Sequence, residues 1–423
     1  MSLSKLHPTK IAEICNGYWL NEDIPQFAFH HVVIDSRQMA GNSLFIALKG
    51  AHKDGHDFLA SLADHPEHGA MVNKPHPEIN LPQLVVADVE ASFQALAKFV
   101  AHNSRARKIA ITGSVGKTGT KDMIADMLAV AGKVHATKGN LNNHLGVPLT
   151  VSNMPEHNDF LVAEMGMNSA GEITLLSEIV RPDIAIITRI SNTHAAFFNN
   201  LSEIAEAKAE IFLGADAFGT AILPRDDEFY GQLAGSARLS GLKNIISFGT
   251  DEDSTIRLEN MEVQEQGLEI TASLPHPQTQ GMRQIVSFTL GMRAKHYAVN
   301  ALCALAVAHA LKLDLAPLLP AFAQMREGAG RGRVHQLHYA ERELTLIDDS
   351  YNASPASMQA ALAAAASYNA ENLLIIASDM LELGAAEIAE HKALAPAIET
   401  AKAKSVIAIG PLMQSCCQHL PEA

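Results

Sequence analysis

The spacing of apolar positions divides the chain into three sections, of which the first covers Met1–Ser104. It contains short apolar runs at His31–Ile34 and Ser43–Leu48, interrupted by pieces rich in Gly, Pro and Asn. Runs of this length between such turns are typical of β-strands. A helical stretch at Ala91–His102 follows, so we expect a small unit that mixes strands and helices.

The second section, from Arg105 onward, alternates apolar runs with helical segments. The apolar runs are Phe160–Ala163, Ile184–Thr188, Ala221–Leu223 and Asn244–Phe248. Strands that alternate with helices predict a parallel sheet covered by helices. Between Ile256 and Leu290 the apolar period changes to two, which predicts an antiparallel appendage. An Ala-rich helix is expected at His296–Leu311.

The Gly- and Arg-rich segment Gly328–Arg333 is the best linker candidate, and a third alternating section follows it. We expect strands at Leu344–Asp348, Leu373–Ala377 and Ser405–Ile409, with helices at Pro355–Ser367 and around Ala386–Thr400. The predicted domains are therefore residues 1–104, 105–329 and 330–423. The fold class is α/β, with a central parallel sheet that carries helices on both faces.

Composition excludes several classes of function. The formal charge of −14 argues against general binding of nucleic acid, which needs a basic face. No apolar run is long enough to span a bilayer, and the N-terminal residues do not resemble a signal peptide. Four cysteines without metal-ligand spacing suggest reduced thiols in a cytoplasmic protein.

The most informative segment is Ile109–Thr120, IAITGSVGKTGT. An apolar run ends at Thr112, and a Gly-rich turn leads into a helix-forming segment, which is the layout of a phosphate-binding loop. Two residues separate the glycines instead of the usual four, but the strand–turn–helix context is retained. Lys117 would reach the terminal phosphates and the Thr118 hydroxyl would hold Mg²⁺. The predicted nucleotide-binding residues are Gly113, Ser114, Val115, Gly116, Lys117, Thr118 and Gly119.

Three further residues are candidate metal ligands at the same sheet edge. Glu164 follows an apolar strand, and an acid at that position beside a phosphate-binding loop can hold Mg²⁺; the alternative is a solvated acid. His194 lies beyond the strand Ile184–Thr188, and the alternative is a packed or surface histidine. Lys208 falls on the apolar stripe of its helix, where a lysine either extends to water or points inward for a reason.

Six motifs occur in an order that resembles the Mur ligases, ATP-dependent enzymes that form amide bonds in peptidoglycan synthesis. These motifs are TGSVGKT, GNLNNHLGVPLT, AEMGMNSAGEI, AKAEIF, HYAVN and DDSYNASP. DDSYNASP and DMLELG are similar to the branch that joins D-alanyl-D-alanine to UDP-N-acetylmuramoyl-tripeptide. The alternatives are a member that adds a single amino acid and a non-catalytic nucleotide-binding relative.

The resemblance implies roles for the three domains. It implies a smaller α/β N-terminal domain that binds the uridine nucleotide, a central ATP-binding domain and a Rossmann-like C-terminal ligase domain. Members of the family usually continue beyond the segment that ends at Ala423 with another strand and a helix. The resemblance therefore implies that the last domain is truncated, with an exposed sheet edge and a lower stability than the other two.

The resemblance also assigns catalytic residues. Lys208 matches a lysine that the family carbamylates, and Glu164 and His194 match its other metal ligands, with two Mg²⁺ ions implied. Arg333, in the sequence GRGR, matches a phosphate-contacting arginine, and Arg331 is the alternative.

The remaining assignments concern the nucleotide and the sugar substrate. Asn300 and Asp349 match nucleotide-contacting positions, with Asp349 expected at the ribose. Ser36 and Arg37 are candidates for the uridine end of the substrate. The UDP-sugar candidates are Asn142 and Asn143. For these four residues the alternative is a plain turn or helix-capping role.

The implied reaction begins when the terminal carboxylate of the UDP-muramoyl peptide attacks the γ-phosphorus of ATP. Because two negative charges must meet, Mg²⁺ and Lys117 are needed to offset their repulsion. The resulting acyl phosphate is then attacked by the amine of D-alanyl-D-alanine. A cytoplasmic monomer is expected.

Overall fold

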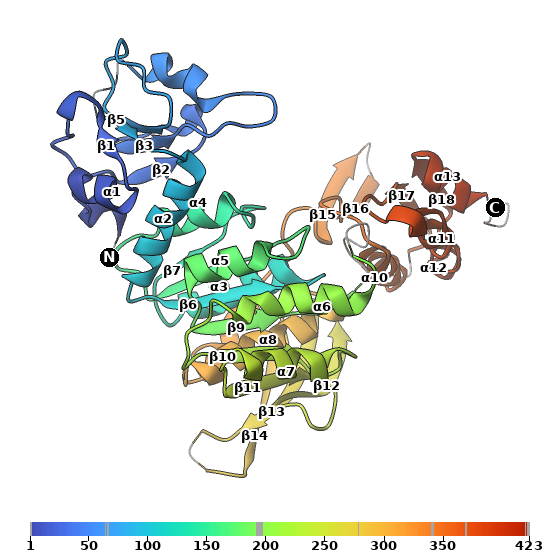
Figure 1. Ribbon diagram of the computed structural model, residues 1–423. Helices are drawn as coiled ribbons and strands as arrows, with labels where there is room; N and C mark the ends of the chain where they lie inside the picture. Colours follow the sequence, from blue (N-terminus) through green and yellow to red (C-terminus); the bar gives the residue numbers. More distant parts are fainter. Residues whose placement is uncertain are drawn as a thin grey trace.

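The computed structural model of the chain describes residues 2–63, 65, 67–191, 198–277, 279–339, 342–368, 370–418 and 420. Three groups of elements follow one another along the chain (Figure 1). Within the described residues, no helix is both long and apolar enough to cross a lipid bilayer.

The first group is built around a five-stranded sheet in the order β1-β5-β4-β3-β2. Strands β2 to β5 are parallel, and β1 pairs antiparallel with β5. Helix α2 begins after Asp88, whose side chain accepts a hydrogen bond from the Ala91 amide. The elements are α1 (Pro8–Ile14), β1 (Tyr18–Trp19), β2 (His31–Val33), β3 (Ser43–Ile46), β4 (Gly69–Val72), β5 (Gln83–Val85) and α2 (Val89–His102).

The second group contains a nine-stranded sheet in the order β14-β13-β12-β11-β10-β9-β6-β8-β7. All neighbours from β7 to β12 are parallel, and β13 is antiparallel to both of its neighbours, β12 and β14. The predicted antiparallel appendage therefore continues the parallel sheet. The strands are β6 (Arg107–Thr112), β7 (Val134–Ala136), β8 (Phe160–Glu164), β9 (Ile184–Ile187), β10 (Thr220–Pro224), β11 (Asn244–Gly249), β12 (Ile256–Gln264), β13 (Gly267–Pro275) and β14 (Arg283–Leu290).

Helices cover both faces of the parallel strands, which explains why these strands are apolar throughout. Along β6, Ile109 and Ile111 belong to a core with α3 and α8, while Ala110 faces the core that includes α5, α6 and α7. The predicted helices on both faces are thus confirmed. The helices are α3 (Lys117–Ala129), α4 (Gly146–Ser152), α5 (Glu172–Val180), α6 (Leu201–Ala209), α7 (Tyr230–Leu239), α8 (His296–Ala310) and α9 (Leu319–Phe322).

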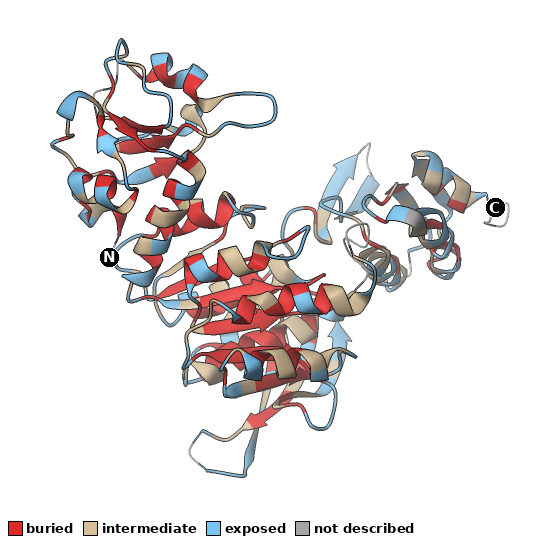
Figure 2. Ribbon diagram, viewed as in Figure 1, coloured by how far each residue is buried: buried red, intermediate tan, exposed pale blue. Residues whose placement is uncertain are grey.

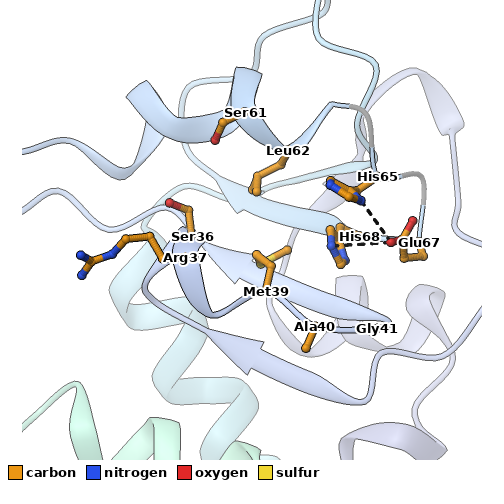
Figure 3. Close-up of a pocket in the computed structure, with 10 residues that line it drawn as sticks. All are labelled: Ser36, Arg37, Met39, Ala40, Gly41, Ser61, Leu62, His65, Glu67 and His68. Atoms are coloured by element: carbon orange, nitrogen blue, oxygen red, sulfur yellow. Dashed lines mark ion pairs between the residues drawn. The ribbon is translucent and has the colours of Figure 1, made fainter.

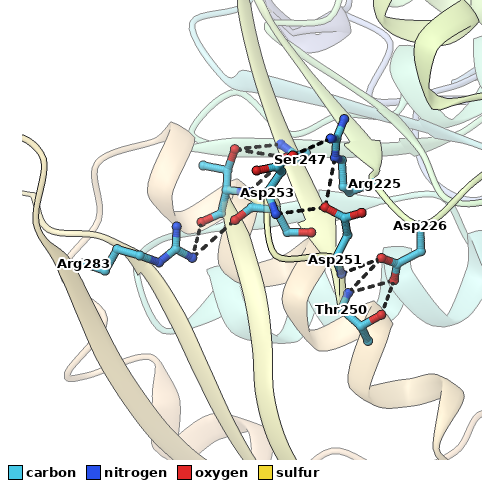
Figure 4. Close-up of polar contacts among 9 residues, drawn as sticks. Arg225, Asp226, Ser247, Thr250, Asp251, Asp253 and Arg283 are labelled. Atoms are coloured by element: carbon cyan, nitrogen blue, oxygen red, sulfur yellow. Dashed lines mark hydrogen bonds and ion pairs between the residues drawn. The ribbon is translucent and has the colours of Figure 1, made fainter.

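A polar network fixes the turn where the parallel part of this sheet meets the antiparallel part (Figure 4). The Asp226 carboxylate, just after β10, accepts hydrogen bonds from the backbone amides of Thr250 and Asp251, each at 2.8 Å. Arg225 donates to Asp251 and Asp253 at 3.3 and 3.0 Å. These contacts hold the connection from β11 to β12 against the end of β10.

The third group has two small sheets. Strands β15 (Arg333–Tyr339) and β16 (Arg342–Asp348) form an antiparallel hairpin, and β17 (Leu374–Ser378) pairs parallel with β18 (Ser405–Ile409). The helix expected around Ala386–Thr400 is divided into α11 (Glu387–Lys392) and α12 (Ala395–Thr400). Pro396 lies in the first turn of α12, where a missing amide is tolerated. The other helices are α10 (Pro355–Ala366) and α13 (Pro411–Cys417).

Burial is unequal among the three groups (Figure 2). Strands β3, β4, β8, β9 and β10 are buried at every position. In the third group, several large apolar side chains of the strands remain 47 to 63 % exposed, namely Leu344, Leu346, Leu374, Ile376, Ile407 and Ile409. The third group therefore has less of its apolar surface removed from water than the other two.

Candidate active site

The glycine loop lies between β6 and α3, in the strand–turn–helix arrangement that the sequence predicted. Gly116 is the N-cap of α3 and has a left-handed backbone conformation, with φ of 83°. Gly113 has φ of 150°, and a Cβ atom there would collide with Oγ1 of Thr188. Both positions therefore require glycine for conformational or steric reasons. The N-terminus of α3 directly follows the loop, which is the arrangement of an anion-binding loop.

The loop is tied to the chain that follows the neighbouring strand β9. Ser114 donates its amide to the carbonyl of Arg189 at 2.8 Å and its hydroxyl to the carbonyl of Ser191 at 3.0 Å. The Thr188 hydroxyl donates to the carbonyl of Val115 at 2.7 Å. These bonds fix the loop backbone from one side.

Lys117 folds back over the loop. Its Nζ donates to the carbonyl oxygens of Gly113 and Ser114 at 2.7 and 3.4 Å. Burial lowers the pKa of Lys117, and the negative charge of Glu164 opposes that shift while Arg331 adds to it. The ammonium is thus held at the loop, in the electrostatic field of an acid at the end of the next strand.

Glu164 ends β8 and its side chain is almost completely buried, with 1 % of the residue exposed. One carboxylate oxygen, Oε1, accepts a hydrogen bond from Nδ2 of Asn142 at 2.8 Å. The other, Oε2, is buried and has no hydrogen-bond partner among the described residues. A buried carboxylate oxygen without a partner is costly, so this atom is placed as a metal ligand would be. The Thr118 hydroxyl, in the first turn of α3, offers a second oxygen donor, and oxygen donors suit Mg²⁺.

Lys208 points inward from α6, and 1 % of it is exposed. No described side chain accepts a hydrogen bond from its Nζ. Burial lowers the pKa of Lys208 well below its ordinary value, and the positive charge of Lys117 lowers it further. The amine is therefore biased toward its neutral, nucleophilic form. The third predicted ligand, His194, lies outside the described residues.

The N-terminal end of α8 borders the start of α3. A Cβ atom at Gly119 would lie 3.3 Å from Nδ2 of Asn300, and one at Gly116 would lie 3.5 Å from Oδ1 of the same side chain. The Asn300 amide is therefore beside the loop, where the sequence analysis expected a nucleotide contact. Tyr297, one turn earlier, is buried and donates its hydroxyl to the carbonyl of Arg331 at 2.8 Å.

Arg331 connects the loop to the third group of elements. Its guanidinium donates to Oγ1 of Thr118 at 3.0 Å and lies over the ring of Tyr351, 4.0 Å from the centroid. Asp349 is close enough to Arg331 for that charge to lower the pKa of its carboxyl, although burial raises this pKa more strongly. Arg333, which the sequence analysis preferred, is exposed and begins β15 opposite Asp348. The structure thus brings Arg331 rather than Arg333 to the loop.

The substrate-binding candidates occupy two places. Ser36 and Arg37, in the turn after β2, line a pocket of about 390 Å³ in the first group (Figure 3). The Arg37 guanidinium is exposed and paired with Asp35 at 2.7 Å. Asn142 binds Glu164, and Asn143 accepts a hydrogen bond from the Gly146 amide at 2.9 Å. Asn143 therefore makes the kind of turn contact that was the alternative to substrate binding.

A glycine loop after a central parallel strand, with a lysine and a buried acid at the same sheet edge, defines a P-loop α/β protein. Family models identify it further: the Mur ligase family catalytic domain matches residues 28–111, the Mur ligase middle domain residues 111–308, and the Mur ligase glutamate ligase domain residues 332–422. The chain belongs to the Mur ligase family.

Curated relatives match over most of their length. UDP-N-acetylmuramoyl-tripeptide--D-alanyl-D-alanine ligase of Bacillus subtilis is 33% identical over 405 residues, which cover 95% of this chain and 84% of that protein. The enzyme of the same name from Escherichia coli is 33% identical over 403 residues, which cover 95% of this chain and 85% of that protein. The resemblance stated from the motifs is thus confirmed.

Solved structures agree with the fold. MurF from Acinetobacter baumannii superimposes with a TM-score of 0.87 at 29% identity, covering 99% of this chain and 89% of that one. MurF from Thermotoga maritima, solved in complex with ADP, superimposes with a TM-score of 0.73 at 22% identity, covering 90% of this chain and 88% of that one. At this identity the match shows likeness of fold alone. The predicted α/β fold class is confirmed.

Proposed function

We propose that this chain is the ATP-dependent ligase that joins D-alanyl-D-alanine to UDP-N-acetylmuramoyl-tripeptide in the synthesis of peptidoglycan precursors. Relatives that carry this name match 95% of the chain at 33% identity. The observation that carries the proposal is the P-loop of the central sheet, which holds Lys117 within the electrostatic field of the buried Glu164. Both residues lie inside the match to the Mur ligase middle domain.

We assign one task to each of three domains. Residues 1–104 bind the uridine nucleotide, with Ser36 and Arg37 at its pocket. Residues 105–329 bind ATP through the P-loop. Residues 330–423 complete the nucleotide site with Asp349 and an arginine. We assign this arginine to Arg331 because its guanidinium contacts Thr118. We further propose that the enzyme is a cytoplasmic monomer.

The reaction proceeds in two chemical steps. A carboxylate oxygen of the tripeptide attacks the γ-phosphorus of ATP, the bond to the β–γ bridging oxygen breaks, and ADP leaves with that electron pair. The amine of D-alanyl-D-alanine then attacks the acyl carbon, loses a proton, and expels inorganic phosphate. Lys117 and the loop amides stabilise the negative charge that develops on the transferred phosphoryl group.

The donors that would hold Mg²⁺ are the hydroxyl of Thr118 and Oε2 of Glu164. When bound, the metal would neutralise phosphate oxygens and so reduce the repulsion of the incoming carboxylate. Asn142 orients Glu164 by donating to Oε1, and within the described part of the chain Oε2 has no hydrogen-bond partner. We propose His194 as a further ligand and two ions in total.

We also propose that Lys208 is carbamylated. Its amine nitrogen adds to the carbon of CO₂ and releases one proton, which yields an anionic carbamate. The support is a buried amine whose pKa is well below its ordinary value, with Lys117 as a nearby positive charge. A carbamate would replace the repulsion between two cations by an attraction and would supply a bidentate oxygen donor.

The carbamate can be tested by chemical rescue. Lys208→Ala should lose most activity, and a short-chain carboxylate should restore part of it by supplying the missing oxygen donors. Lys243→Ala, at an exposed lysine, is the matched control and should keep full activity. Full activity of Lys208→Ala, or no rescue by any short-chain carboxylate, would contradict the assignment.

The acceptor is tested by supplying ATP, UDP-N-acetylmuramoyl-tripeptide and different amines. Product with D-alanyl-D-alanine and none with single amino acids is the expected result. Product with a single amino acid and none with the dipeptide would overturn the proposal and favour an amino-acid-adding ligase.

A further inference from the structure

A second cluster of potential metal ligands lies far from the P-loop in the sequence, at the turn before β4. His65, Glu67 and His68 lie together at one end of the pocket that Ser36 and Arg37 also line (Figure 3). Among the described residues, this is the group of histidines and acids that meets the spacing of a metal site. The reaction proposed above uses none of the three.

The distances among the donor atoms are those of a small coordination sphere. Oε1 of Glu67 lies 3.3 Å from Nδ1 of His65 and 3.8 Å from Nε2 of His68. One donor atom from each residue can be chosen so that all lie within 4.8 Å of one another. A tetrahedral Zn²⁺ ion with bonds of about 2.0–2.1 Å holds its donors roughly 3.3–3.4 Å apart. Small side-chain movements would therefore close the site.

The backbone places the two rings side by side. The amide of His65 donates to the carbonyl of Leu62 at 3.2 Å, and the amide of His68 donates to the carbonyl of His65 at 3.0 Å. This turn brings the two imidazole centroids to 5.2 Å. Because His68 directly precedes β4, one ligand is anchored to a buried strand.

The buried ring of His68 provides an independent observation. Its side chain is 5% exposed, yet Nδ1 has no hydrogen-bond partner in the described part of the chain. Nε2, at 3.8 Å from Glu67, is beyond hydrogen-bond distance. Burying an imidazole nitrogen without a partner is unfavourable. Nε2 is the ring nitrogen on the side of Glu67, and it is the donor that this ring would offer to a cation.

We propose that His65, Glu67 and His68 bind a divalent transition-metal ion of the zinc class. Two imidazole nitrogens and one carboxylate are ligands of Zn²⁺ sites that keep an open fourth position. Mg²⁺ prefers oxygen donors, so this site is chemically distinct from the one at Glu164. The pocket beside the three side chains leaves room for water as the fourth ligand. Zinc binding here does not depend on the ligase activity.

The test is titration of the metal-free full chain with Zn²⁺ by calorimetry, without nucleotide. His65→Ala is the informative variant because this side chain is 56% exposed and its removal should not disturb folding. We expect it to lose one equivalent of bound Zn²⁺, or to bind that equivalent roughly tenfold more weakly or worse. Glu67→Gln should behave in the same way.

The matched control is His76→Ala. Nδ1 of His76 lies 2.9 Å from Oε1 of Glu78 in the same group of elements, but this pair has no third potential ligand among the described residues. His76→Ala should bind Zn²⁺ with the same affinity and stoichiometry as the unmodified chain. Mg²⁺ should displace Zn²⁺ from neither protein. Equal Zn²⁺ binding by His65→Ala, Glu67→Gln and the unmodified chain would overturn the proposal. A tetrahedral Co²⁺ absorption spectrum that disappears in His65→Ala would support it.

Discussion

At the scale of single residues, the sequence was most informative where the backbone conformation restricts residue choice. Gly113 and Gly116 could be assigned to the P-loop because two glycines placed between an apolar strand and a helix are typical of a phosphate-binding turn. Lys208 and Arg331 were harder to assign. The direction in which a lysine points, and which of two arginines two positions apart reaches the site, are determined by tertiary contacts. The local spacing of residues carries no information about such contacts.

The requirement for glycine at position 113 can be measured. Gly113→Ala places a Cβ against Oγ1 of Thr188 at a positive φ, so it should lower the free energy of unfolding by about 1–3 kcal/mol and abolish ATP binding. Gly231→Ala in α7 meets no atom within 4 Å and should be stabilising by about 0.5–1 kcal/mol. Denaturant unfolding compares the two variants. Equal stability of Gly113→Ala and the unmodified chain would contradict this account of the loop.

Lys208 should make stability depend on pH. Because its folded-state pKa is lowered, the unfolded chain binds more protons than the folded chain between the two pKa values. Stability from this group therefore rises with pH in that window. Lys208→Met removes the penalty and should raise the free energy of unfolding near pH 7 by about 1 kcal/mol, while abolishing activity.

The advantage of Lys208→Met should shrink as the pH approaches about 10. Denaturant unfolding in CO₂-free buffer measures this, because carbamylation would itself change the charge. A difference between Lys208→Met and the unmodified chain that is constant with pH would count against a buried amine with a lowered pKa.

At the scale of elements, five strands of the central sheet, β6 and β8 to β11, were predicted from periodicity because both faces are buried and the runs are continuous, whereas the short edge strand β7 was missed. Strand β15 was missed, since His335, Gln336 and His338 interrupt its apolar pattern. The division between α11 and α12 was also missed, although Pro396 was the available signal. The connection of β12 to the parallel sheet depends on the network around Asp226, which no local pattern encodes.

The segment between α9 and β15 gives a prediction that separates two arginines. Arg331→Ala removes the contact with Thr118 and should lower kcat by roughly 10²-fold. Arg333→Ala, two residues later at an exposed position, should have a much smaller effect. Steady-state kinetics on both variants decides between them. A larger loss for Arg333→Ala would mean that it, and not Arg331, contacts the phosphate during the reaction.

At the scale of the whole molecule, the three groups of elements differ in how much apolar surface they bury. One large core cluster spans the first two groups and a second lies within the second group, whereas the cluster of the third is smaller and includes Leu362, Met380, Leu394 and Met413. The site draws on the second and third groups, which are joined at the P-loop by the contact between Arg331 and Thr118. The sequence could predict the three groups but not this contact.

The unequal burial predicts unequal resistance to proteolysis. Under limiting protease, cleavage should occur first beyond residue 332, because local opening is easiest where few apolar side chains are buried. Mass spectrometry of the early fragments identifies the sites. Cleavage that begins in the central sheet, or resistance equal to that of the central sheet, would contradict the prediction.

The central claim is that the P-loop performs ATP-dependent ligation. The most direct measurement is inorganic phosphate release from ATP with UDP-N-acetylmuramoyl-tripeptide, in the presence and absence of D-alanyl-D-alanine. The account predicts sustained release that requires both substrates and is abolished in Lys117→Ala. Phosphate release that ignores either substrate, or no release while ATP remains bound, would contradict it.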